Sequence, residues 1–407
     1  MARAVPLALA AMAVVSVSAI SVSPLAAQRL KLSVPLAELE RRLRADSNDA
    51  AAHYNVALGY WSAKRYDDAE RALTQALAIE PRFAAARLAL AYLPFARRPK
   101  LWKEILRDRV PDDWRPAVEQ FDREYRHAFL VDPMVDMRIM GAGEPLAPDL
   151  ADMRDVFGEA FALYVQGFTD CEEGRYQDCF GRFQAMIREI DGDRFPDRIP
   201  LSALWYQALA AGHLGRWQEA AANLQQSLDR MLDWEKKLEE EKEKGKDFVR
   251  TPLRSNEYRY FLAFTRQHGG DAIEAVRLYR EALEKDLSLY AAHVQMANIL
   301  EAQKRYPEAV AERHRAVNAN PDDPSLPLDL GVTLGKAGRF AEAEQALAQA
   351  IERNPRDTRT LFWLGICQVQ LGKDAEAKES LSRFVATAPK RYERQIAMAQ
   401  QRLAQLR

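Results

Sequence analysis

The sequence predicts an all-α protein, a right-handed superhelical solenoid of stacked helix-turn-helix units that ends in a C-terminal capping helix. Certain residue types recur every 34 positions in the C-terminal half, and small residues hold fixed places within that period. A period of this length is typical of two-helix repeats, in which each unit buries its apolar face against its neighbours. The recurring positions are Pro321, Pro355 and Pro389; Ala309, Ala343 and Ala377; and the pairs Leu330-Gly331 and Leu364-Gly365.

The unit from Pro324 to Asp357 shows what each element of a repeat requires. Gly331 and Ala343 are small, so we expect the two antiparallel helices to approach most closely there. Gly338 provides the backbone freedom of the turn between the helices. Pro355 then stops the second helix, because proline lacks an amide N–H and clashes with the preceding turn.

The N-terminal half carries the same pattern with looser spacing. Its marker residues are Tyr60, Tyr66, Ala69, Leu73, Ala76 and Pro81; Gly167, Gly174, Tyr176, Cys179 and Phe183; and Ala208, Gly215, Trp217, Ala220 and Leu224. With four consecutive units after Asn256, the pattern occurs in seven places and resembles the tetratricopeptide repeat family. Cys179, Asp374 and Phe384 depart from the family's usual residue types.

Prolines and glycines divide the array into regions. Pro94 and Pro99 interrupt a first helix, and its second helix is expected late, over residues 116–130. A charge run from Glu235 is expected to extend the preceding helix into solvent. The predicted regions are 28–133 with an insertion at 94–113, an irregular loop at 134–155, a central repeat region at 156–250, a C-terminal array at 251–390, and a capping helix at 391–407.

The first 27 residues have the features of a secretory signal peptide. Arg3 precedes an apolar run, and small residues around Ala27 suit cleavage. No later apolar stretch approaches the ~20 residues that a membrane-spanning helix needs. We therefore expect an exported, periplasmic protein with no integral membrane segment in the mature chain. In that compartment, a membrane-associated protein is one kind of partner open to it.

The composition restricts the kinds of ligand. Lys and Arg number 58 against 59 Asp and Glu, and no basic stripe indicates nucleic-acid binding. Metal-protease, serine-hydrolase, phosphate-loop and Cys-x-x-Cys motifs are absent from the sequence, so neither an enzyme nor a cofactor is predicted. Met134, Met137 and Met140 could offer thioethers to copper(I), but nearby His or Cys donors are missing, and no metal site is predicted.

In the family that the repeats resemble, partners bind on the concave surface lined by first helices. The positions implied for this groove are Tyr54, Leu58, Tyr164, Phe168, Trp205, Leu209, Tyr260, Phe264, Val294, Asn298, Leu328, Val332, Phe362 and Ile366. These residues are largely apolar and aromatic, which suits a peptide or an amphipathic helix. Asn298 alone fits the family's carboxylate-binding pattern, so a terminal-carboxylate ligand is not expected.

Two arrangements of the groove stay open from the sequence. Either the aromatic side chains face a partner, or the chain fills the groove itself. In the second case they pack on each other or are covered by the insertion around Trp102 and Trp114. The predicted function is a protein-binding scaffold or assembly factor of the cell envelope. The alternatives are a structural adaptor that binds through its convex face or the 94–150 insertion, and a subunit of an envelope enzyme. Pairing of Cys171 with Cys179 is also left open.

Overall fold

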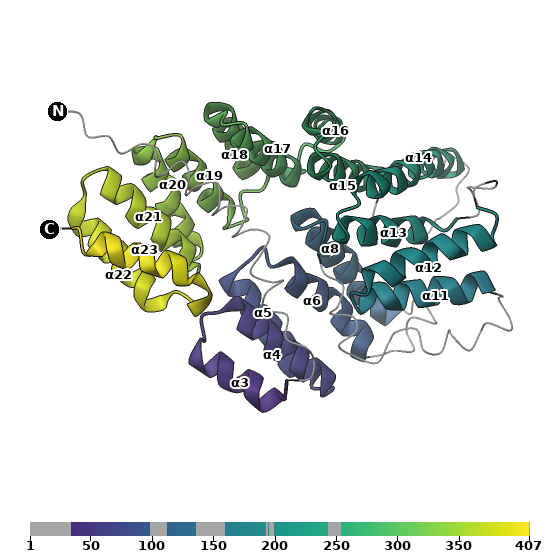
Figure 1. Cartoon of the computed structure of the whole chain (residues 1–407), viewed down its shortest axis with the longest axis horizontal. Helices are drawn as coiled ribbons and strands as arrows, with labels where there is room; N and C mark the ends of the chain where they lie inside the picture. Colours follow the sequence, from purple (N-terminus) through teal and green to yellow (C-terminus); the bar gives the residue numbers. More distant parts are fainter. Residues whose placement is uncertain are drawn as a thin grey trace. The chain divides into compact units, whose positions relative to one another are not determined.

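The computed structural model describes residues 34–97, 112–135, 159–192, 194, 199–242 and 254–406. Within these residues every regular element is a helix (Figure 1). They form two compact units: one contains residues 34–59, 71–82 and 293–406, and the other contains 60–70 and 83–292. The predicted signal peptide, most of the 94–113 insertion and most of the 134–155 loop lie outside the described residues.

In the part of the chain that the structure describes, the helices form eight consecutive pairs, each a first helix followed by a second. The pairs are α4 (Ala50–Ser62) and α5 (Tyr66–Ile79); α6 (Ala84–Arg97) and α8 (Arg115–Val131); α11 (Glu159–Glu172) and α12 (Tyr176–Glu189); α13 (Leu201–His213) and α14 (Trp217–Lys242); α15 (Ser255–His268) and α16 (Ala272–Lys285); α17 (Tyr290–Ala302) and α18 (Tyr306–Ala319); α19 (Leu326–Lys336) and α20 (Phe340–Arg353); and α21 (Thr358–Gln370) and α22 (Asp374–Thr387). Helix α8 lies where the sequence predicts the late second helix, and it packs against α6. The predicted repeat solenoid is confirmed.

The turn between the two helices of a repeat places one residue in the left-handed region. Gly338 has φ +75° and Gly372 has φ +71°. Lys304 occupies the equivalent position one repeat earlier at φ +61°. Glycine suits this position because it lacks the Cβ atom that makes the left-handed conformation costly.

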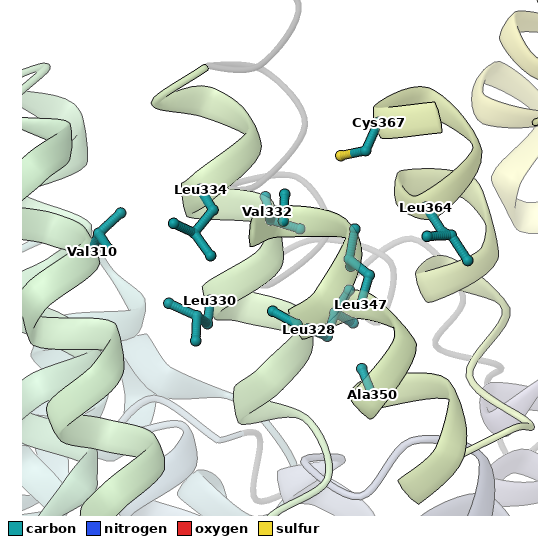
Figure 2. Close-up of a cluster of buried hydrophobic side chains, with 11 residues drawn as sticks. Val310, Leu328, Leu330, Val332, Leu334, Leu347, Ala350, Leu364 and Cys367 are labelled. Carbon is teal, nitrogen blue, oxygen red and sulfur yellow. The ribbon is translucent and has the colours of Figure 1, made fainter. Parts of the chain in front are cut away.

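Glycine also sets the helix spacing within a repeat. A Cβ atom added to Gly331 would lie 2.6 Å from Leu347 Cγ, and one added to Gly365 would lie 2.6 Å from Leu381 Cγ. Figure 2 shows the surrounding core, in which Leu347 lies among side chains from neighbouring repeats. The close approach predicted at Gly331 is therefore present.

Short helices cover both ends of the array. Helix α23 (Glu393–Leu403) carries Ala399 and Ile396 onto the last repeat, where they join a buried cluster with Phe362 and Leu381. The predicted capping helix is confirmed. At the other end, α3 (Leu36–Ala45) brings Leu36 and Leu39 against Gly59 of α4.

Within the first unit, loops beside the N-terminal helices contact loops of the C-terminal repeats. Loops on the two sides meet through polar contacts: Asn354 Nδ2 to Ile79 O (3.1 Å), Arg391 Nη1 to Asp49 Oδ1 (3.0 Å), Arg391 Nη2 to Glu80 Oε2 (3.2 Å), Arg82 Nε to Asp323 Oδ2 (2.9 Å) and Asn48 Nδ2 to Thr387 O (3.2 Å). The repeat pattern does not predict these contacts, because the residues that make them lie in loops more than 200 positions apart in the sequence.

The three cysteines fall into two classes. Cys171 near the end of α11 and Cys179 near the start of α12 form a disulfide, with their Cα atoms 5.1 Å apart. This separation lies within the ordinary range for disulfides, so the tight turn between the helices brings the pair together. Cys367 is a buried free thiol, as expected, and burial raises its pKa to about 12.

Candidate partner-binding groove

Two first helices of the second unit, α13 and α15, contact another helix of the same unit. The C-terminal end of α8 reaches both, and Phe129 is the aromatic side chain that contacts them. Its ring centroid lies 5.1 Å from that of Trp205 on α13 and 6.3 Å from that of Phe261 on α15. Trp205 and Phe261 also contact each other at 4.7 Å. Perpendicular and tilted arrangements of this kind are the favoured geometries for aromatic pairs.

The residues of α8 follow a helical spacing that serves two neighbours at once. Phe121, Tyr125 and Phe129 are four residues apart, so they lie along one side of the helix. Phe121 packs against Tyr92 and Phe95 of α6, at 5.1 and 5.2 Å between ring centroids. The N-terminal half of this aromatic row therefore completes the α6–α8 pair, while Phe129 reaches the next first helices.

Hydrogen bonds fix the C-terminal half of α8 in this position. The hydroxyl of Tyr260 donates to the backbone carbonyl of Leu130 at 2.8 Å. Arg126 Nε donates to Glu257 Oε1 at 2.6 Å, and the Glu257 side chain is 4% exposed. A charge-assisted bond to a buried carboxylate is among the stronger polar contacts in proteins.

This packing determines how far the predicted groove residues reach solvent. Trp205 is 5% exposed, Leu209 is buried, and Tyr260 is fully buried. Burial likewise raises the pKa of the neighbouring Tyr258 hydroxyl to about 12. At α13 and α15 the chain itself therefore covers the predicted groove positions, which matches the second of the two arrangements left open by the sequence.

Helix α8 is a covering segment that the sequence does not suggest. It begins at Arg115 and carries its contacts to α13 and α15 on residues 126–130. Cover by the insertion around Trp102 and Trp114 stays a prediction. Trp102 lies outside the described residues. Helix α8 can make these contacts because its aromatic side chains serve two neighbours. Phe121 packs on α6 within its own repeat, and Phe129 contacts α13 and α15.

Two predicted groove residues on α11 are only half-buried. The Tyr164 hydroxyl shares a hydrogen bond with Ser202 Oγ at 2.9 Å, and its ring packs edge-on against Phe183. Phe168 packs against Tyr206 at 4.9 Å between ring centroids. Of the predicted groove residues in the second unit, these two keep the most contact with solvent. Phe264, also in this unit, is buried beside Trp217 and His268.

The remaining predicted residues belong to the first unit. Tyr54 is buried on α4 and Leu58 is half-buried one turn later. Phe362 is buried under the capping region, 5.2 Å from the Phe384 ring. The structure places Trp205 against Tyr258 and Phe261, and Tyr260 against Tyr279 of α16. Tyr54, Leu58, Asn298 and Phe362 belong to the separately described unit.

Asn298 is part of a buried charge network instead of a free groove. Its Oδ1 atom accepts a hydrogen bond from Arg313 Nη2 at 2.7 Å. Arg313 also pairs with Glu301 at 3.1 Å, and Lys336 Nζ lies 2.5 Å from the same carboxylate. Burial alone would raise the pKa of Glu301, but Arg313 and Lys336 outweigh it and lower the pKa. Asn298 therefore orients a structural ion cluster.

Two histidines and the methionine group, for which no site is predicted, have ordinary structural contacts. His213 stacks on Tyr176 at 3.9 Å, and a ring nitrogen of His268 contacts the Phe264 carbonyl. Met134 packs against Gly212, while Met137 and Met140 lie outside the described residues. Across the described ranges, no cluster of three His, Cys, Asp or Glu side chains has the arrangement of a metal site. No helix in this part of the chain has the length and apolar character to cross a membrane.

The fold and the groove define a helical-repeat protein of the kind that works through protein contacts. Two tetratricopeptide repeat family models match the sequence, one over residues 50–83 and the other over residues 328–392. These ranges correspond to α4 with α5 and to the last two repeats with η4 (Lys390–Tyr392). The chain therefore carries tetratricopeptide repeats over these two ranges.

Solved structures of the same repeat type are similar at low identity. A tetratricopeptide repeat protein from Parabacteroides merdae is 13% identical with a TM-score of 0.43, over 61% of this chain and 93% of that one. MamA from Desulfovibrio magneticus is 17% identical with a TM-score of 0.36, over 46% and 94%. The C-terminal part of a repeat-containing protein from Cytophaga hutchinsonii is 11% identical with a TM-score of 0.42, over 54% and 77%. A search among curated proteins gave no match.

Proposed function

We propose that this protein is an exported, non-catalytic interaction scaffold of the cell envelope that binds its partner through surfaces outside the concave groove. One observation carries the proposal: helix α8 occupies the aromatic face of α13 and α15. A partner using that face would have to remove Phe129, which is fully buried. Removing a buried aromatic side chain from such a contact costs about 3–5 kcal/mol. A partner that binds on surfaces outside the groove does not have to displace Phe129.

Two further observations support the location. The N-terminal residues have the composition of a secretory signal, and Cys171 is disulfide-bonded to Cys179. Disulfides persist in oxidising compartments such as the periplasm and are rare in the cytosol. Reporter fusion of residues 1–40 tests export: periplasmic reporter activity supports the proposal, and retention in the cytoplasm contradicts it.

A competition experiment tests the binding surface. Partners would be captured from an envelope extract with and without an excess of a peptide that has the sequence of residues 115–135. The matched control peptide replaces Tyr125 and Phe129 by Ala. If a partner binds outside the groove, neither peptide changes its capture. A loss of capture with the native peptide alone would contradict the proposal, because any partner able to displace α8 competes with that peptide.

The half-buried pair on α11 favours a second candidate function. Tyr164 and Phe168 keep part of their surface in solvent, so a peptide could contact the groove at α11 without displacing α8. Substituting Phe168 by Ala, with thermal unfolding as the control for folding, separates the two candidates. Capture lost in a folded Phe168→Ala variant supports groove binding at α11, whereas unchanged capture supports the outer surfaces.

A further inference from the structure

The loop before the last helix breaks a pattern that the two preceding loops share. Asp323 and Asp357 lie one 34-residue period apart, and each side chain accepts a hydrogen bond from the backbone amide two residues later. Carboxylates in this position satisfy free amides at the start of a helix. The next residue in the series is Arg391, which cannot accept such a bond because a guanidinium has only donors. The local structure of the repeat therefore does not account for Arg391.

The partners of Arg391 come from the loops that flank α4 and α5. The Arg391 side chain is 6% exposed, with Nη1 3.0 Å from Asp49 Oδ1 and Nη2 3.2 Å from Glu80 Oε2. Arg359 Nη1 lies 3.5 Å from the other carboxylate oxygen of Glu80. Glu80 and Arg391 are 311 positions apart in the sequence. Two largely buried cations of the C-terminal repeats are therefore neutralised by carboxylates from the N-terminal side.

A second charge contact in the same unit has the opposite polarity. Here the N-terminal side supplies the cation, since Arg82 Nε lies 2.9 Å from Asp323 Oδ2 and Arg82 Nη1 lies 2.6 Å from Asp329 Oδ2. Turning one set of loops end for end would bring Arg82 toward Arg391 and Asp49 toward Asp323. Like charges across a contact are costly, so the charges select a single orientation for the two sets of loops.

The C-terminal repeats build their cores from their own residues. Within the described residues, their two buried apolar clusters are made of side chains between Val310 and Leu406. The contacts with the N-terminal loops described above are hydrogen bonds and ion pairs, and polar interfaces within one chain allow the joined parts to move relative to each other. Because removing one member of a buried ion pair leaves the other charge unpaired, the pairs should form and separate together.

We propose that these charges form a clasp that closes the first unit and opens in a single step. The clasp consists of Asp49, Glu80 and Arg82 on the N-terminal side and Asp323, Arg359 and Arg391 on the C-terminal side. In an open repeat array, each terminal repeat is stabilised by a single neighbour. Closure gives both terminal repeats a second contact, so each depends on charges that the other carries. This conformational device goes beyond the proposed scaffold function, because it acts within one chain.

Hydrogen exchange of the purified protein tests this mutual dependence. In Arg391→Gln, exchange in peptides from residues 50–59 and 71–79 should rise at least about tenfold, because Asp49 and Glu80 lose their cation. Arg82→Gln, at the other end of the clasp, should raise exchange in peptides from η4 and α23, because the clasp opens as one step. Arg394→Gln, at an exposed position on α23, is the matched control and should leave exchange in residues 50–59 and 71–79 unchanged.

Spin labels measure the opening itself. Ala37→Cys on α3 and Ala397→Cys on α23 place labels at exposed positions on the two sides, and double electron–electron resonance gives the distance between them. Arg391→Gln and Arg82→Gln should each add a longer distance to that of the unaltered protein.

Two results would overturn the clasp. One is a rise in exchange that stays within η4 and α23 in Arg391→Gln, and the other is a distance distribution that neither substitution changes. If Arg391→Gln does not fold, Arg82→Gln carries the same test from the other end. Because both assays contain no other protein, their failure is distinct from failure of the scaffold proposal.

Discussion

Replacing Phe129 by Ala removes the side chain that holds α8 over α13 and α15. Phe129 is fully buried and contacts the rings of Tyr125, Trp205 and Phe261. Truncation of a buried phenylalanine to alanine costs about 3–5 kcal/mol, which includes the cavity left behind. The substitution should lower the free energy of local opening of α13 and α15, because these helices lose their contact with Phe129.

Hydrogen exchange followed by mass spectrometry measures the local opening free energy of each helix. A repeat array does not unfold in a single two-state step, so local exchange is more informative than a global midpoint. A loss of about 3–5 kcal/mol corresponds to exchange faster by roughly 10²- to 4 × 10³-fold in peptides from α13 and α15. Glu119→Ala, at an exposed position on α8, is the control and should leave exchange unchanged. Exchange in α13 and α15 that rises less than about threefold in Phe129→Ala would refute the account of the covered groove.

Three further predictions concern the repeats. Gly331→Ala should destabilise its repeat by about 1–3 kcal/mol, because the added Cβ would meet Leu347. Gly335→Ala on the same helix should instead stabilise the repeat by about 0.5–1 kcal/mol. Urea unfolding measures both changes, and equal changes for the two variants would contradict the close approach at Gly331. Glu301→Gln should cost about 3–5 kcal/mol at pH 7, because it leaves Arg313 and Lys336 buried without their anion. The folded pKa of Glu301 is lowered, so its contribution is present above the unfolded value of about 4.3 and is lost as the pH falls through the folded pKa. Thermal unfolding of the unaltered protein and of Glu301→Gln is measured from pH 7 to pH 3. The difference between their midpoint temperatures should shrink as the pH falls. A difference that stays constant would exclude the ion cluster as the cause of the lost stability. Deleting residues 389–407 should expose Phe362 and Leu381 and promote aggregation; a soluble truncated chain of equal stability would mean that α23 is not a cap.

The internal structure of each repeat is predictable because its determinants are close together in the sequence. Gly331 and Ala343 fix one helix pair, and Gly338 fixes the turn between them, all within 13 residues. The 34-residue period then repeats this local information. The amphipathic spacing of Ile396 and Ala399 likewise predicts the cap from within one helix.

The long-range contacts leave no comparable signal. Phe129 reads as an ordinary core residue of a second helix, and nothing in its surroundings indicates Trp205, 76 positions later. Asp49 and Arg391 look like solvated loop charges until the fold brings them to 3.0 Å. Aromatic side chains on first helices indicate a buried contact, but a partner protein and the chain's own helix satisfy that pattern equally well. The period of the sequence determines the repeats, whereas the occupant of the groove depends on distant pairs.

The contact between Phe129 and Trp205 is the central claim of this account, and a double-mutant cycle measures it directly. Phe129→Ala, Trp205→Ala and the double variant would be compared with the unaltered protein through the local opening free energy of α15. Aromatic pairs in contact couple by about 0.5–1.5 kcal/mol, and the account predicts a coupling free energy in that range. Additivity of the two substitutions within about 0.3 kcal/mol would contradict the placement of α8 in the groove.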